Sequence, residues 1–158
     1  MTFEECFAKL MELEGGYSDH AADPGGKTRY GITEVVAREN GYRGDMRELP
    51  IQFAMQIYRD RYWNLVHADK LPDEIRFAVF DAAVNSGTRQ SARWLQRAVG
   101  VEADGKIGPI TITASWRADP HVTVRKLACQ RLRFMADLSN WQHFGRGWAR
   151  RICDILET

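Results

Sequence analysis

The chain has 158 residues, 44% of them hydrophobic and 27% charged, with a formal net charge of +1. This length fits one compact domain, and the sequence contains no apolar run of the roughly 18 residues that a membrane-spanning helix needs. We therefore expect a globular protein without stable membrane insertion.

Residues 3–14 predict a helix with one buried face, because apolar side chains recur at intervals of three and four: Phe3, Cys6, Phe7, Leu10 and Leu13. Thr2 and Glu5 fit a capping box at its start, and Gly15-Gly16 fit its end. Glu14 lies near the buried face at the last turn. Partial burial and the negative end of the helix dipole would both raise its pKa, as a general acid requires. A surface glutamate at a helix end fits the local pattern equally well.

A glycine-rich polar loop follows this helix and contains Asp23-Pro24-Gly25-Gly26. Proline and glycine here are turn residues, and glycines also let backbone approach a ligand closely. Tyr17 and Tyr30 would offer flat faces and hydroxyl groups to sugars. Residues 17–33 are long enough to form a short β-hairpin. We expect Thr33 to cap the helix that begins after it.

The rest of the chain is predicted to be helical. Residues 51–63 form an amphipathic stretch after a proline, and residues 73–86 are apolar nearly all round, which is typical of a buried central helix. Asp81 and Asn85 share one face of that central helix. Buried polar groups need partners, so the pair forms either a structural hydrogen-bond network or the lining of a cleft beneath Glu14.

Thr88 is expected to cap a helix that carries Trp94 and Leu95 and ends at Gly100. A turn-rich segment over residues 104–109 precedes further helices. Aromatic residues recur near the end of the chain, where core packing is commoner than sugar stacking: Trp141, Phe144 and Trp148.

Charge is divided unevenly along the chain. Residues 1–88 hold 10 Lys/Arg and 15 Asp/Glu, whereas residues 89–158 hold 12 and 6. A basic half suits an acidic polymer such as murein, whose peptides carry carboxylates, but it also suits nucleic acid or a membrane surface. The arginines of residues 124–135, including Arg131, fit equally well as the solvated face of an amphipathic helix.

Cysteine and metal chemistry are disfavoured. The chain has three cysteines, an odd number, and their spacing is not that of metal ligands: Cys6, Cys129 and Cys153. Each lies in an apolar helical stretch, so we expect buried, reduced thiols. The four histidines show no close pairing suited to zinc. No metal or cofactor is expected.

Several motifs, in order, resemble the glycoside hydrolase family 108 N-acetylmuramidases, which include phage endolysins and bacterial secretion-activator muramidases. They cover nearly the whole chain: Glu14-Gly15-Gly16-Tyr17, residues 23–33, Tyr62-Trp63, Leu71-Pro72, residues 80–87, Trp94-Leu95-Gln96, residues 104–111 and residues 147–151. The segment at 104–111 resembles the peptidoglycan-binding half of such proteins.

The resemblance implies that Glu14 is the catalytic acid, with Asp23 as a base or electrostatic stabiliser and Thr28 positioning a water. The spacing between Asp23 and Thr28 is one residue shorter than in phage-type lysozymes, and Asp19 competes for the role of second carboxylate. Tyr17, Tyr30, Asp81 and Asn85 are the expected substrate-binding residues.

We therefore predict a mainly α, lysozyme-like single globular body, with a catalytic region over residues 1–90 and a peptidoglycan-binding-like helical region over residues 91–158. The expected function is cleavage of the β-1,4 bond between N-acetylmuramic acid and N-acetylglucosamine, by a phage or prophage endolysin. A lytic transglycosylase and a non-catalytic murein-binding module are the alternatives.

The N-terminus is acidic and lacks the basic and apolar regions of a signal peptide. We expect a monomer made in the cytoplasm, which reaches the periplasmic wall through a holin or a secretion system. We expect its partner to be peptidoglycan and not nucleic acid.

Overall fold

The computed structural model describes residues 1–13 and 26–158. The described elements are, in chain order, α1 (Phe3–Leu13), β1 (Thr28–Arg29), β2 (Ile32–Thr33), α2 (Glu34–Glu39), η1 (Met46–Glu48), α3 (Ile51–Tyr58), η2 (Arg59–Trp63), η3 (Ala68–Lys70), α4 (Asp73–Ser86), α5 (Thr88–Val99), α6 (Pro109–Arg117), α7 (Pro120–Ala136) and α8 (Trp141–Leu156). The prediction of a mainly α, single body with a short hairpin inside residues 17–33 is confirmed.

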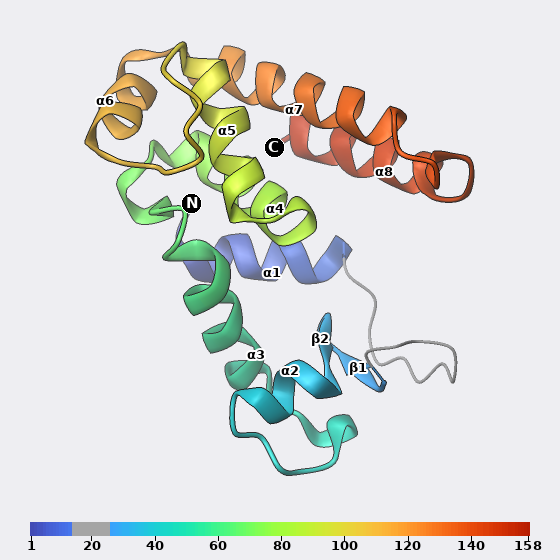
Figure 1. Ribbon diagram of the computed structural model, residues 1–158. Helices are drawn as coiled ribbons and strands as arrows, with labels where there is room; N and C mark the ends of the chain where they lie inside the picture. Colours follow the sequence, from blue (N-terminus) through green and yellow to red (C-terminus); the bar gives the residue numbers. More distant parts are fainter. Residues whose placement is uncertain (14–25) are drawn as a thin grey trace.

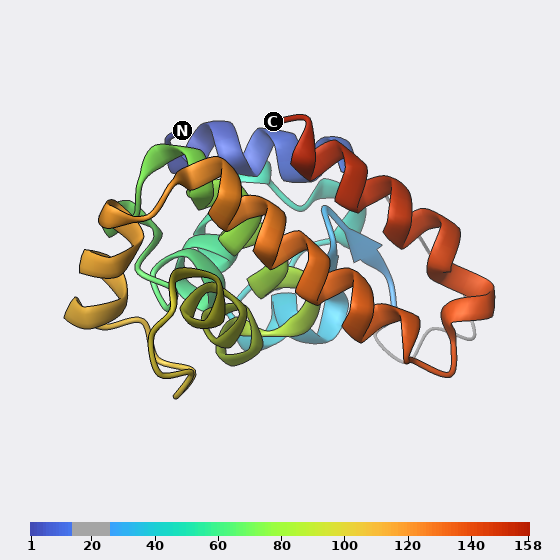
Figure 2. The same ribbon diagram turned by 90° about the horizontal axis from the view of Figure 1, so that it is seen from above.

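The helix α4 lies at the centre of the molecule. Figure 1 shows α1 passing beneath it, α5 and α7 beside it, and the hairpin, α2 and α3 below. Figure 2 shows that α7 and α8 run side by side along one side of the body. The chain ends meet on that side, where the Lys9 ammonium contacts the Thr158 hydroxyl.

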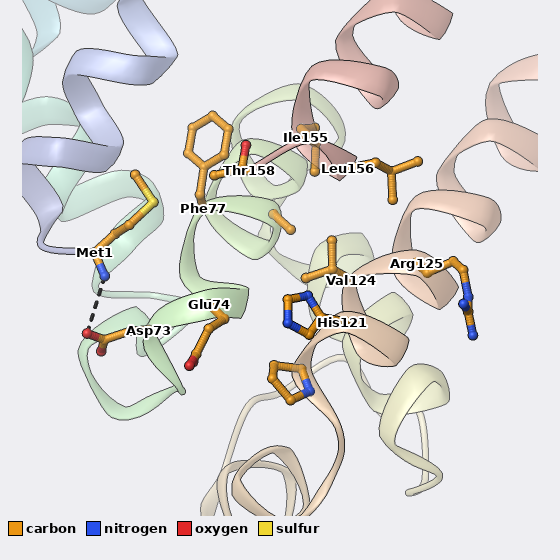
Figure 3. Close-up of a pocket in the computed structure, with 12 residues that line it drawn as sticks. Met1, Asp73, Glu74, Phe77, His121, Val124, Arg125, Ile155, Leu156 and Thr158 are labelled. Atoms are coloured by element: carbon orange, nitrogen blue, oxygen red, sulfur yellow. Dashed lines mark ion pairs between the residues drawn. The ribbon is translucent and has the colours of Figure 1, made fainter.

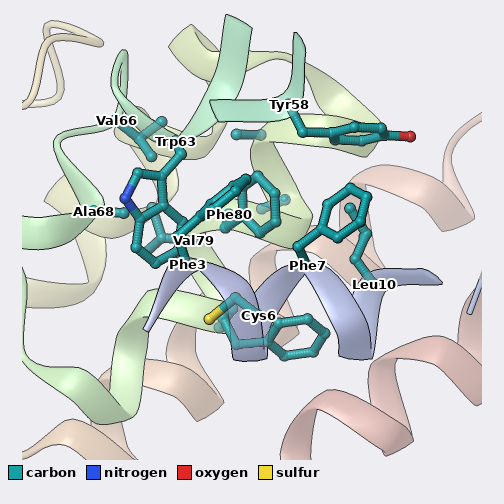
Figure 4. Packing of buried hydrophobic residues seen from close by; sticks show 14 of the residues in the cluster. Phe3, Cys6, Phe7, Leu10, Tyr58, Trp63, Val66, Ala68, Val79 and Phe80 are labelled. Atoms are coloured by element: carbon teal, nitrogen blue, oxygen red, sulfur yellow. The ribbon is translucent and has the colours of Figure 1, made fainter. Parts of the chain in front are cut away.

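The predicted helical face of α1 packs into an aromatic core. Phe3 meets Trp63 and Phe80 edge to face, with ring centroids 5.3 and 5.9 Å apart, and Phe7 meets Tyr58 at 5.5 Å (Figure 4). Such pairs stabilise beyond the area they bury. This cluster fixes α1 against α4 and against the end of α3.

Two predicted helix caps are confirmed. The Thr2 amide donates to the Glu5 carboxylate at 2.7 Å and the Glu5 amide donates to the Thr2 hydroxyl at 3.2 Å, which makes the capping box of α1. The Thr33 hydroxyl accepts from the Val36 amide at 3.3 Å and caps α2. The entry into each helix is thus set by local sequence.

The hairpin is a minimal antiparallel pair in which Thr28 faces Thr33 and Arg29 faces Ile32. Its turn uses left-handed backbone at Tyr30 (φ 52°) and Gly31 (φ 72°). This conformation is strained at a non-glycine residue such as Tyr30.

The predicted helix over residues 51–63 is divided. α3 is α-helical to Tyr58 and continues as a π-helical turn, η2, in which the Asn64 amide donates to the Arg59 carbonyl at 2.9 Å. Single π turns are rare and often lie at functional sites.

The second half packs on α4 through α5 and α7. Trp94 and Leu95 of α5 are buried, and Gly100 ends that helix in the left-handed region (φ 77°) as predicted. The buried Gln96 side chain holds the following turn, donating to the Asp104 carboxylate at 2.7 Å and accepting from the Gly105 amide at 2.9 Å. These contacts explain the Trp94-Leu95-Gln96 and Asp104-Gly105 motifs.

Three predictions are wrong. Thr88 is the first residue of α5 and Gly87 is its cap. Cys6 is buried, but Cys129 and Cys153 are exposed, because each lies on the outer side of its helix. Arg131 is not on a solvated face: it is 1% exposed and turns inward, because α7 packs its own buried face against α4 and α5.

Candidate active site

A cleft opens where the hairpin, α3, η2 and the last turn of α4 meet. Its volume is about 380 Å³. Among the described residues it is lined by Gly31, Ile32, Thr33, Val36, Ile57, Tyr58, Arg61, Tyr62, Val84 and Asn85. Phenol, guanidinium and amide groups lie here beside the apolar side chains of Ile32, Ile57 and Val84. Such a mixed lining is suited to a sugar, which presents hydroxyls at its edge and C–H groups on its faces.

Tyr58 connects the floor of this cleft to the hairpin. Its hydroxyl donates to the Tyr30 carbonyl at 3.0 Å, across 28 positions of sequence, and its ring lies 5.6 Å from that of Tyr62. The strained backbone of Tyr30 is held in place by this bond. The π turn of η2 sets the direction in which Tyr62 leaves the helix.

Tyr30 itself, a predicted sugar-binding residue, is half-buried beside the cleft and is not part of its lining. The Arg29 guanidinium lies 5.0 Å from the Tyr30 ring centroid and donates to its hydroxyl at 3.2 Å. The ring thus lies stacked beneath a cation, with one face covered.

Thr28, predicted to position a water, lies on β1 and is half-buried. Its hydroxyl donates to the Gly26 carbonyl at 3.4 Å, a long and weak contact. Thr33 lines the cleft, and its hydroxyl caps α2. The helix cap is the role that its hydrogen bond shows.

Asp81 and Asn85 share a face of α4 but have different surroundings. The Asp81 side chain is 0% exposed; one carboxylate oxygen accepts from Arg131 at 2.8 Å and the other from Arg151 at 2.7 Å. Asn85 is exposed, lines the cleft, and donates through Nδ2 to the Asp81 carbonyl at 2.8 Å. Asp81 therefore belongs to a structural network, while Asn85 remains a candidate for contact with substrate.

The two arginines were not recognised from sequence as partners of Asp81. Burial lowers the pKa of the Arg131 guanidinium from its ordinary value, and the Asp81 carboxylate opposes that shift. A basic residue at an inward-facing position of a predicted amphipathic helix is the sequence signal for such an ion pair, because a buried charge needs a partner of opposite sign.

Glu14, Tyr17, Asp19 and Asp23 lie outside the described residues. Leu13, directly before Glu14, is the last described residue of α1 and packs against the core. Within residues 1–13 and 26–158, no group of three or more His, Cys, Asp or Glu side chains is arranged to hold a metal ion.

A larger apolar pocket lies elsewhere, between the start of α4, the start of α7 and the end of α8 (Figure 3). Its volume is about 400 Å³, with Phe77, Val124 and Ile155 inside and the ion pair between the Met1 ammonium and Asp73 at its rim. It contains none of the predicted site residues, so size alone does not identify the active site.

Comparisons with known proteins agree with this geometry. The glycosyl hydrolase 108 family profile matches residues 7–87, and a predicted peptidoglycan domain profile matches residues 90–153. Among solved structures, Brucella abortus SagA is similar, with 33% sequence identity and a TM-score of 0.84, over 98% of this chain and 91% of that one. A search of curated proteins finds no match.

The fold, together with the two family matches and the similar solved structure, defines a lysozyme-like glycoside hydrolase that acts on peptidoglycan. The chain belongs to the glycosyl hydrolase 108 family. In the described part of the chain, no helix is both long and apolar enough to cross a membrane.

Proposed function

We propose that this protein is an N-acetylmuramidase in which Glu14 protonates the departing glycosidic oxygen. The single observation that carries the proposal is the cleft beside the last turn of α4, lined by Tyr62, Arg61 and Asn85, in a chain of the glycosyl hydrolase 108 family. Glu14 follows α1 directly in sequence, and α1 packs on α4. Hydrolysis then needs a second group to guide water or to stabilise the oxocarbenium-like transition state.

Asp23 and Asp19 are the two candidates for that second group, and Thr28 is the candidate for holding the water. A separation of roughly 6.5–9.5 Å between the carboxyl groups goes with inversion, and roughly 5–5.5 Å with retention. The two variants Asp23→Asn and Asp19→Asn, compared on one substrate, identify which carboxylate the reaction needs.

The deciding experiment digests purified Gram-negative sacculi with the wild type and with Glu14→Gln, and identifies the products by mass. Reducing muropeptides from the wild type alone are expected, and borohydride labelling places the new end on muramic acid. Near-normal lysis by Glu14→Gln would end the proposal. Products lighter by one water would make the protein a lytic transglycosylase, and binding without any products would leave a murein-binding module.

The biological setting is also a proposal: a monomeric phage or prophage endolysin, made in the cytoplasm and released to the periplasmic wall by a holin or a secretion system. The likeness to the phage-type motifs supports it. Expression in a Gram-negative host, with and without a co-expressed holin, tests it. Lysis only with the holin would support release by a holin, and lysis without it would support release through a secretion system. No lysis in either case would contradict the proposal. Size-exclusion chromatography checks the monomer.

A further inference from the structure

A second hollow, here called the basic groove, lies between α5 and α7. Its volume is about 350 Å³. Among the described residues it is lined by four cationic side chains, one thiol and one amide: Arg97 from α5, and Arg125, Lys126, Cys129, Gln130 and Arg133 from α7. None of these residues lines the cleft beside α4, so the basic groove is a separate surface.

The sequence of α7 brings most of the basic groove to one face of that helix. Arg125, Cys129 and Arg133 are four residues apart, and this spacing places side chains one above another on an α-helix. Gln130 ties this part of α7 to α5, because its Nε2 group donates to the Trp94 carbonyl at 3.0 Å. The arginine of α5 lines the same hollow from the neighbouring helix.

The four cations of the basic groove have no acidic partner in the described part of the chain. No ion pair between described residues includes any of them. In the first half of the chain, by contrast, Arg38, Arg59 and Arg61 each form an ion pair with a glutamate. All four side chains of the groove are exposed, so their charged groups are open to an incoming ligand.

The charge of the basic groove suits a ligand with several carboxylates. A hollow lined by one sign of charge concentrates ligands of the opposite sign, and a guanidinium group binds a carboxylate through two parallel N–H···O bonds. Peptidoglycan is such a ligand, because its peptide stems carry free carboxylates and recur along each glycan strand. The groove also lies within residues 90–153, which match the predicted peptidoglycan domain profile.

We propose that the basic groove anchors the protein to the wall by binding the carboxylates of peptidoglycan stems. This deepens the proposed function, and it rests on it in that the polymer held is the substrate. Because the groove and the cleft share no lining residue, the stems in the groove belong to a stretch of wall other than the sugars in the cleft. The cleft then supplies cleavage, and the groove supplies affinity that weakens as the salt concentration rises.

Binding to two forms of sacculi tests whether the carboxylates are recognised. Purified sacculi are used as isolated, or after their stem carboxylates have been converted to amides. Co-sedimentation measures the affinity of Glu14→Gln for each form, because turnover is expected to be absent in this variant. The amidated form should bind about 10-fold more weakly, as the loss of several exposed ion pairs implies. Equal affinity for the two forms would overturn the proposal.

A pair of charge reversals separates the basic groove from general attraction to the basic half. Arg125→Glu with Arg133→Glu, built into Glu14→Gln, should weaken binding to native sacculi about 10-fold, because attraction at two positions becomes repulsion. Arg146→Glu with Arg150→Glu is the matched control: it changes the net charge equally, at exposed residues of α8 outside the groove. The control should change the affinity by no more than about 2-fold, because salt screens distant charges. Equal weakening by the two double variants would overturn the proposal.

The thiol in the basic groove reports where the ligand lies. Cys129 and Cys153 are both exposed, but only Cys129 lines the groove. Soluble muropeptides that carry stems should slow the reaction of Cys129 with N-ethylmaleimide, a neutral reagent, about 10-fold at ten times their Kd. The rate at Cys153 should stay the same. Protection of Cys129 by phosphatidylglycerol vesicles and not by muropeptides would overturn the proposal in favour of a membrane surface.

The outcomes distinguish this proposal from the proposed function. Carboxylate-dependent binding through the basic groove, without any cleavage by the wild type, would contradict the muramidase and support the anchoring surface. Cleavage by the wild type, with both double variants bound equally well to native sacculi, would support the muramidase and contradict the anchoring surface.

Discussion

Asp81 in α4 and Arg131 in α7 form an ion pair of 2.8 Å between side chains that are 0% and 2% exposed, across 50 positions of sequence. Arg151 in α8 holds the other oxygen of the same carboxylate, 70 positions away. One buried carboxylate thus joins the region that matches the glycosyl hydrolase profile to the region that matches the peptidoglycan profile. Removing one partner of such a cluster leaves buried charge without compensation.

Asp81→Ala is expected to destabilise the protein by about 3–5 kcal/mol, because it leaves the buried Arg131 guanidinium unpaired. Urea unfolding, followed by tryptophan fluorescence, measures the change. Asp154→Ala is the control: Asp154 is an exposed residue of α8, and its loss should change stability by no more than about 0.5 kcal/mol. Equal, small effects from the two variants would mean that the cluster contributes little to folding.

Asn85→Ala should lower kcat/KM on sacculi about 10-fold, as loss of one substrate hydrogen bond implies. Its Nδ2 group is used by the Asp81 carbonyl, so the amide oxygen is the part expected to accept from a sugar hydroxyl. Steady-state kinetics with the unfolding midpoint measured in parallel separates activity from stability. Asn64→Ala, at an exposed position outside the cleft, should leave kcat/KM unchanged. Unchanged activity in Asn85→Ala would remove Asn85 from the site.

Two of the three cysteines should react with a thiol reagent in the native protein. Cys129 and Cys153 are exposed, whereas burial raises the pKa of the Cys6 thiol to about 12, so that Cys6 stays protonated and covered at pH 8. Titration with an aromatic disulfide should release two equivalents of chromophore from folded protein and three in denaturant. Three equivalents from folded protein would contradict the burial of Cys6.

Asp104 should make stability depend on pH in the acid range. The hydrogen bond from the Gln96 side chain, followed by that from the Lys106 amide, lowers the pKa of Asp104 below its ordinary 3.8. A lowered folded-state pKa contributes stability above the unfolded-state value, and that contribution is lost as pH falls through the folded-state pKa. The stability difference between wild type and Asp104→Asn should therefore shrink below about pH 4. A difference that is constant across that range would contradict the shift.

Local sequence determined the parts of the fold that depend on neighbouring residues. The capping box of Thr2 and Glu5 and the cap at Thr33 involve residues three apart, and the all-round apolar character of α4 reflects its central position. Gly100 ends α5 because left-handed backbone costs glycine little. For the two caps and for Gly100, the physical cause lies within about one turn of the helix concerned.

The surroundings of Asp81 could not be predicted in the same way. Its partners lie 50 and 70 positions away, and an arginine on an amphipathic helix is usually solvated. Pairing depends on how α7 and α8 settle on α4, which is a property of packing. The roles of Glu14, Tyr17, Asp19 and Asp23 remain predictions, because these residues lie outside those described by the structure.

The π turn at Arg59–Trp63 has a consequence for insertions and deletions in this protein. An α-helix turns by about 100° per residue, so taking one residue out of this stretch would regularise the helix and rotate the downstream residues by that angle. Trp63, which packs against Phe3 and Phe80, would leave the core while Tyr62 left the cleft. The π turn thus changes the angular position, around the helix axis, of the residues that follow it. As a result, Trp63 points into the core while its neighbour Tyr62 points into the cleft.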